Sequence, residues 1–171
     1  MKRLLAVSYG VGVGVGVGVR RALSGILIFV MLLAMGVTYA QESVINKSSK
    51  PAAIVVLSNG GFGLVFFNLL NVGFPSVTAT LPKKLMGIEW TTTYYPDAVG
   101  ESVEFCYFRP YNSVKENCRA ISPNSSGVVL DFNDLPFGNG AGVTIRHNVE
   151  GAGVPVANAA GNDSVTYRYS Y

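Results

Sequence analysis

Short segments in which apolar and polar residues alternate recur about every ten residues along the chain. The clearest cover 87–95, 101–108, 143–149 and 164–171, and Gly, Pro and Asn separate them. A period of two places successive side chains on opposite faces of an extended strand. No amphipathic helix of ordinary length interrupts the series. The pattern predicts an all-β fold, an immunoglobulin-like antiparallel β-sandwich of about seven or eight short strands, either complete or lacking one strand.

The strongest of these segments reads S-V-T-Y-R-Y-S-Y and covers 164–171. Val165, Tyr167, Tyr169 and Tyr171 share one face of the strand, and Ser, Thr and Arg occupy the other. A strand face with four large side chains has to pack against something. We therefore expect an assembly or interface strand here, which meets the chain's own core, another protein or a membrane.

The first forty residues have the features of an export signal. Two arginines precede an apolar run at 26–35, and the sequence T-Y-A before Gln41 places small residues three and one before a cleavage point. A basic region, an apolar region and a small-x-small site in this order are typical of a cleaved signal peptide. We predict that 1–40 is removed between Ala40 and Gln41. The alternative is a retained signal anchor, because Ala22 to Tyr39 carries no charge and is long enough to span a bilayer.

The net charge of +3 belongs to this leader. Residues 1–40 contain four basic residues and no acid, which leaves nine basic and ten acidic residues in the remainder. A basic nucleic-acid footprint is therefore excluded. We expect the chain to be exported to the periplasm or cell surface of a Gram-negative bacterium, and to meet the membrane only through its signal peptide.

Behind the leader, the sequence predicts a flexible N-terminal arm at 41–52 and a single β-sandwich domain at 53–171. The arm is polar and ends in K-S-S-K before a proline. The apolar run 62–72 has no clean period and could be a buried strand or a short helix. Residues 77–81 alternate with threonine and predict a strand.

Cys106 and Cys118 are the only cysteines in the chain. An even cysteine count in an exported protein predicts a disulfide. Closing a loop of about a dozen residues should stabilise the fold by roughly 3 kcal/mol. A metal site or a redox pair is disfavoured, because no histidine is near in the sequence and there is no C-x-x-C motif.

The single histidine, His147, lies on the apolar face of its strand between Ile145 and Val149. No G-x-S-x-G or comparable motif accompanies it, so we expect a hydrogen-bonded core residue rather than a member of a triad. The ten carboxylates are scattered, and nothing points to a glycosidase pair. We therefore expect no catalytic residues, no metal site, no cofactor and no enzymatic activity.

The sequence G-A-G-V-T-I-R-H-N-V-E-G-A-G-V-P-V at 140–156, followed by S-V-T-Y-R-Y-S-Y, resembles the last two strands of fimbrial subunits of the chaperone–usher pathway. The resemblance implies an exported structural or adhesive subunit of a surface fimbria. It also implies an incomplete sandwich that a neighbouring subunit's N-terminal arm completes by strand addition. The implied partners are other subunits and a periplasmic chaperone.

Three alternatives remain open from the sequence. The chain could be a self-contained secreted or periplasmic binding or inhibitor module, with the closing strand in its own core. A small outer-membrane β-barrel would need at least eight strands of about ten residues. An enzyme of unrecognised type would show a pocket with convergent polar groups. A hydrophobic groove left open beside strand 164–171 would favour the fimbrial subunit.

Overall fold

The computed structural model describes residues 41–115, 117–151 and 153–171, so the predicted signal peptide lies outside the described residues. Within them the chain forms ten strands and two short 3₁₀ turns. The strands are β1 (Glu42–Ser49), β2 (Ile54–Val55), β3 (Gly61–Asn68), β4 (Lys84–Thr91), β5 (Ser102–Phe108), β6 (Asn117–Ile121), β7 (Ser126–Val129), β8 (Gly142–Val149), β9 (Val156–Ala157) and β10 (Asp163–Ser170). The turns are η1 (Asn71–Gly73) and η2 (Ser76–Thr78).

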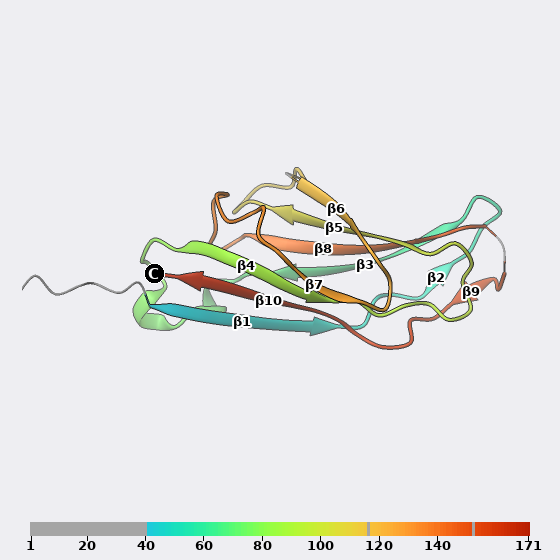
Figure 1. Cartoon of the computed structure of the whole chain (residues 1–171), viewed down its shortest axis with the longest axis horizontal. Helices are drawn as coiled ribbons and strands as arrows, with labels where there is room; N and C mark the ends of the chain where they lie inside the picture. Colours follow the sequence, from blue (N-terminus) through green and yellow to red (C-terminus); the bar gives the residue numbers. More distant parts are fainter. Residues whose placement is uncertain (1–40, 116, 152) are drawn as a thin grey trace, which may run out of the picture. The chain divides into compact units, whose positions relative to one another are not determined.

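Two four-stranded antiparallel sheets form the body of the domain (Figure 1). One has the strand order β1-β10-β4-β7, and the other has the order β3-β8-β5-β6. Their inner faces contribute to one buried apolar cluster, while a short β2–β9 ladder carries a second, smaller cluster. The prediction of an all-β sandwich is confirmed. The strand count exceeds the expected seven or eight partly because β2 and β9 have only two residues each.

The strand predicted to be an interface, β10, lies inside the first sheet. It pairs along its length with β1 on one side and with β4 on the other. Val165, Tyr167 and Tyr169 are fully buried, and the Tyr167 hydroxyl donates a hydrogen bond of 2.6 Å to the carbonyl of Phe67 in the opposite sheet. Of the three alternatives left open for this strand, these three residues meet the chain's own core. Tyr171 is partly buried and packs against the same cluster.

The expected flexible arm at 41–52 is corrected, because most of it is strand β1. Its eight residues pair with β10 from Glu42 opposite Ser170 to Ser49 opposite Asp163. Only one of its side chains, Ile45, is buried. The polar sequence concealed the strand because backbone hydrogen bonds, rather than an apolar stripe, hold β1 in the sheet.

The two segments 62–72 and 77–81 adopt different structures. Residues 62–72 form strand β3 and then η1, with Val65 and Phe67 buried and Phe66 exposed. Both faces of this strand carry apolar residues, which is why no period was visible. The strand predicted at 77–81 is wrong, since η2 and a turn occupy it. There the Lys83 ammonium donates to the carbonyls of Thr78, Ala79 and Leu81.

Strand β6 has no alternating sequence pattern, and a covalent bond joins it to β5. Cys118 lies directly opposite Cys106 in the β5–β6 register, and the two form a disulfide. The predicted cysteine pair is confirmed. Four of the five side chains of β6 are exposed, so few apolar contacts hold this edge strand.

The disulfide should therefore stabilise the fold measurably. We expect the double variant Cys106→Ala/Cys118→Ala to lose about 3 kcal/mol of unfolding free energy, because its unfolded chain is less restricted. Urea unfolding under oxidising and reducing conditions measures the loss. Reductant should weaken the wild type and leave the double variant unchanged; a wild type with the same urea midpoint in both conditions would contradict the prediction.

Candidate functional site

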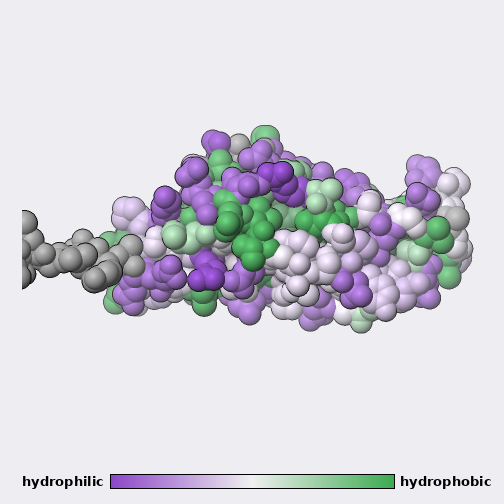
Figure 2. Space-filling model, viewed as in Figure 1, coloured by the Kyte–Doolittle hydropathy of each residue, from purple (hydrophilic) through white to green (hydrophobic). Residues whose placement is uncertain are grey.

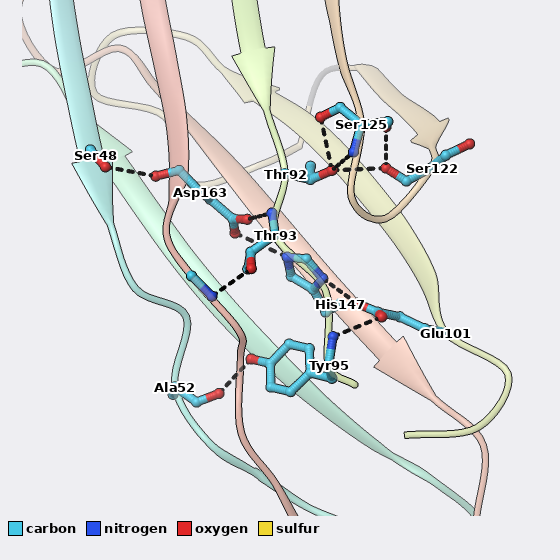
Figure 3. A network of polar contacts seen from close by, with 11 residues as sticks. Ser48, Ala52, Thr92, Thr93, Tyr95, Glu101, Ser122, Ser125, His147 and Asp163 are labelled. Atoms are coloured by element: carbon cyan, nitrogen blue, oxygen red, sulfur yellow. Dashed lines mark hydrogen bonds and ion pairs between the residues drawn. The ribbon is translucent and has the colours of Figure 1, made fainter. Parts of the chain in front are cut away.

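A buried polar network centres on His147, on the inner face of β8 (Figure 3). Its Nδ1 lies 2.7 Å from Oε1 of Glu101, and its Nε2 lies 3.0 Å from Oδ2 of Asp163. The other carboxylate oxygens accept backbone N–H groups, from Tyr95 at 3.0 Å and from Thr93 at 2.8 Å. Asp163 begins β10 and Glu101 precedes β5, so the network joins both sheets at one end of the sandwich.

Tyr95 and Thr93, whose backbone N–H groups bond the two carboxylates, also form hydrogen bonds through their side chains. The Tyr95 hydroxyl donates to the carbonyl of Ala52 at 2.6 Å, and its ring lies 5.3 Å from the imidazole in an edge-on arrangement. Thr93 Oγ1 accepts the N–H of Gly161 at 2.7 Å. Burial, followed by the charges of Asp163 and Glu101, raises the pKa of the Tyr95 hydroxyl well above its usual value. Tyr95 is therefore a neutral hydrogen-bond donor here.

The two carboxylates keep His147 protonated. Burial lowers the pKa of the imidazole, but the hydrogen bonds and negative charges of Asp163 and Glu101 outweigh it and raise the pKa to about 9. The imidazolium donates from both nitrogens, one to each carboxylate. A buried charge is tolerated only when it is paired and hydrogen-bonded, and both conditions are met at His147.

The expectation of a hydrogen-bonded core histidine is confirmed for His147, but its partners were not foreseen. The alternation of the strands could have indicated these partners. Asp163 lies an even number of residues from the inward-facing side chains of β10, and Glu101 lies an even number from those of β5, so both carboxylates are expected to point inward. His147 and Asp163 are fully buried and Glu101 is nearly so, which leaves no approach for a substrate. The arrangement fits a structural ionic clamp, and no nucleophilic hydroxyl is bonded to the imidazole among the described residues.

A different kind of surface lies on the outer side of the β3-β8-β5-β6 sheet. We call it the aromatic face and define it by Phe62, Leu64, Phe66, Phe108 and Arg146. Phe62 and Phe66 are 56% and 61% exposed on the edge strand β3. Isolated exposed apolar residues are ordinary, whereas contiguous apolar patches mark interaction sites.

Arg146 is the centre of the aromatic face. Its guanidinium lies 4.3 Å from the centre of the Phe62 ring, a cation–π contact. Its Nε is buried with no hydrogen-bond partner, and no carboxylate among the described residues forms an ion pair with it. The nearest acid across the strand pair, Glu104, is bonded to Lys115 at 3.0 Å instead. Arg146 can therefore receive an acceptor from outside the chain.

Three shallow hollows meet at this arginine. The largest, of about 570 Å³, runs from the β2 strand past Phe62 to Arg146 and Asn148. A second, of about 270 Å³, lies among Phe62, Phe66 and Phe108, and a third, of about 370 Å³, lies toward Cys118. Sequence reasoning missed this face, because the run 62–72 has no clean period and left a buried strand and a short helix as alternatives. The arginine at an outward position of β8 was the available signal.

The opposite outer face combines hydrophilic side chains with a hydrophobic patch near its middle (Figure 2). Along β10 it presents Ser, Thr and Arg side chains, and Arg168 pairs with Glu89 at 3.3 Å and Glu42 at 3.6 Å. Its exposed apolar residues include Val44 on β1, Met86 on β4, Val128 on β7 and Leu130 just after β7. Arg168 thus has carboxylate partners within the chain, unlike Arg146.

The described residues bring together one further group of possible metal ligands, formed by Glu104, Cys106 and Cys118. Their ligand atoms lie within 4.8 Å of one another. The two sulfur atoms are bonded to each other, so neither is the thiolate that metal binding requires. The group therefore belongs to the disulfide.

The fold and its bonded cysteines define a small disulfide-linked β-sandwich protein. The solved structure of FlhE is similar to it with a TM-score of 0.54 and 15% sequence identity, over 77% of this chain and 100% of that one. A chain of turnip yellow mosaic virus matches 77% of this chain and 93% of its own length, with a TM-score of 0.40 and 11% identity, too distant to bear on the fold. No protein-family model and no curated protein matches the chain. At this identity the similarity to FlhE concerns the fold alone.

The disulfide agrees with export, because such bonds persist in oxidising compartments. Among the described residues, no helix has the length and hydrophobicity needed to cross a membrane.

The ionic clamp predicts a pH dependence of stability. Because the pKa of His147 rises from 6.5 unfolded to about 9 folded, its contribution is complete below pH 6.5 and disappears as the pH rises through 9. We expect wild-type unfolding free energy to fall by about 3 kcal/mol across this window. Urea titrations at a series of pH values measure it.

The variant His147→Gln is the control, since it keeps hydrogen-bonding capacity without a titratable ring. We expect it to be less stable at pH 6.5 and to show a flat profile up to pH 9. A wild-type profile that is equally flat would show that the carboxylates do not hold a proton on His147.

Proposed function

We propose that this chain is an exported, self-contained β-sandwich module that binds another protein through the aromatic face. The observation that carries the proposal is the unpaired guanidinium of Arg146 beside two exposed phenylalanines, Phe62 and Phe66. Arginine and aromatic residues are enriched at protein interfaces and dominate their binding energy. A partner that covers this face would desolvate the rings and supply a carboxylate to Arg146.

The shape of the surface favours a protein over a small molecule. The hollows are open and adjoin one another across the β3-β8-β5-β6 sheet and the neighbouring β2, and they do not converge in one enclosed cleft. Small ligands usually bind in a cavity that buries most of their surface. A broad face with shallow hollows suits an extended segment or a second domain instead.

The position of β10 supports the self-contained module over the fimbrial subunit. Strand addition requires an unpaired strand edge that receives a neighbour's arm. Both edges of β10 are occupied by β1 and β4 of the same chain. The hollows around Arg146 and the one between β6 and β7 contain no residue of β10.

One observation keeps the fimbrial subunit as a second candidate. Strand β1 is held by a backbone ladder and only one buried side chain, Ile45. A strand with so few apolar contacts could leave β10 and be replaced by the same strand of a neighbouring subunit. In that case the chain would assemble through β1, with a chaperone protecting β10 beforehand.

We also propose that residues 1–40 direct the chain out of the cytoplasm and are removed after Ala40. Export agrees with the disulfide, and the leader has the order of regions that signal peptidase recognises. The Gram-negative envelope, either the periplasm or the cell surface, is the proposed destination.

Site-specific crosslinking tests the aromatic face. We expect a photoreactive residue in place of Leu64 to yield a discrete protein adduct in cells that export the full chain. The same residue in place of Thr166, on the opposite outer face, serves as the matched control and should yield none. Arg146→Glu should weaken binding at least 30-fold, as expected for a central interface residue.

The control substitution is Arg168→Glu on the other sheet, which should leave the adduct intact. Equal adducts from both crosslinker positions, or an adduct that survives Arg146→Glu, would refute the proposed face.

The oligomeric state separates the two candidates. We expect the exported wild-type product to be monomeric by light scattering, because β10 is already paired on both sides. Deletion of 41–50 should destabilise the domain and cause aggregation, since it uncovers the edge of β10. The fimbrial subunit predicts instead a wild type that polymerises and a deletion variant that is a folded monomer.

A further inference from the structure

A second apolar surface lies on the segment between β3 and β4, at the end of the sandwich where β1 begins. We call residues 69–83 the end loop (Figure 1). Four of its apolar side chains are exposed: Leu70 by 56%, Val72 by 92%, Val77 by 83% and Leu81 by 45%. They are unconnected to the aromatic face and play no part in the proposed protein binding.

The end loop is held in place from beneath, so these side chains are presented on a fixed support. Phe74 is buried and packs edge-on against Tyr169 at 5.5 Å and against Phe137 at 6.2 Å. The Lys83 ammonium lies 4.8 Å from the centre of the Phe74 ring and bonds three carbonyls of the loop. The exposure of the valines is thus a feature of the folded loop.

The loop's own sequence carries charge of one sign, whereas the acidic Glu42 lies at the same end of the first sheet, opposite Ser170, and pairs with Arg168. From Asn68 to Ile88 the sequence contains no acidic residue, while Lys83 and Lys84 are both present. Exposed apolar side chains beside lysines and without acids are the composition of surfaces that bind anionic lipid headgroups. Such a surface needs no groove.

The place of the loop in the fold brings it near the leader's point of attachment. Gln41 exchanges backbone hydrogen bonds with Tyr171, and a Cβ on Gly73 of the loop would lie 4.0 Å from Ile45 of β1. The uncharged run of the leader ends at Tyr39, and the chain from there to Glu42 spans at most about 10 Å. The predicted leader is therefore joined to the domain at the end that also carries the loop.

We propose that the end loop docks on the anionic surface of the bilayer that the chain crosses. Val72 and Val77 enter the boundary between headgroups and acyl chains, and Lys84 contacts headgroup phosphates. One small apolar loop gives weak, reversible binding, so the contact supplements the leader before cleavage and holds the domain loosely near the membrane afterwards. This extends membrane contact beyond the signal peptide, to which the sequence had confined it.

The test uses the product that cells export from the full chain, labelled with an environment-sensitive probe at Val77→Cys. The matched control carries the probe at Val128→Cys, an exposed apolar position on β7. Vesicles of phosphatidylcholine, with and without phosphatidylglycerol, are added. We expect a blue shift at position 77 with phosphatidylglycerol, none at position 128, and loss of the shift at high salt.

Two variants define the chemistry of the contact. Val72→Asp should abolish the shift at position 77, and Lys84→Glu should weaken it by at least five-fold, the effect of one lysine near an anionic surface. Unchanged urea unfolding of each variant verifies its fold. Phe66→Ser should leave the shift intact, which separates this proposal from binding through the aromatic face.

Three results would overturn the proposal. The first is no shift at position 77 with either vesicle. The second is an equal shift at position 128, which would show adsorption without a preferred face. The third is crosslinking of position 77 to a protein instead of lipid in cells, which would assign the end loop to a protein partner.

Discussion

The whole domain depends on the pairing of β10 with neighbours on both sides. This strand supplies three fully buried side chains to the core, and its two ladders hold the first sheet together. The Tyr167 hydroxyl also reaches the backbone of the second sheet, so one strand links the layers. Because its tyrosines are used in this way, recognition of other molecules must fall to surfaces elsewhere.

The ionic clamp joins the two sheets at one end of the sandwich, as the Tyr167 hydroxyl joins them in the core. It lies between the main core and the small cluster around the β2–β9 ladder, which includes Tyr95. Replacing a buried ion pair with apolar residues often leaves stability unchanged, so the benefit of such a clamp can lie in fixing one arrangement of strands. Here the carboxylates reach His147 from segments before β5 and at the start of β10, and only one register satisfies both.

Much of the fold could be predicted from the sequence, because alternation reveals which side chains point inward. The strands around Phe105, Ile145 and Tyr167 were all recognised in this way, and so was the cysteine pair. Strand β1 could not be, because it is held by its backbone, and neither could η2, where a lysine caps the turn carbonyls. For the surfaces, the alternation of residues in a sequence shows which face of a strand is buried only when the other face is polar. The apolar outward residues of β3 therefore concealed the aromatic face.

The distance along the chain between the paired strands β1 and β10 has a consequence for folding. Ser48 of β1 bonds Asp163 of β10 across a separation of 115 residues. The first sheet cannot be completed before β10 is available, and such long-range topologies fold slowly. For the export proposed above, this order of the strands would keep the first sheet open until β10 has crossed, so Cys106 and Cys118 would reach the oxidising side before β10 enters the sheet.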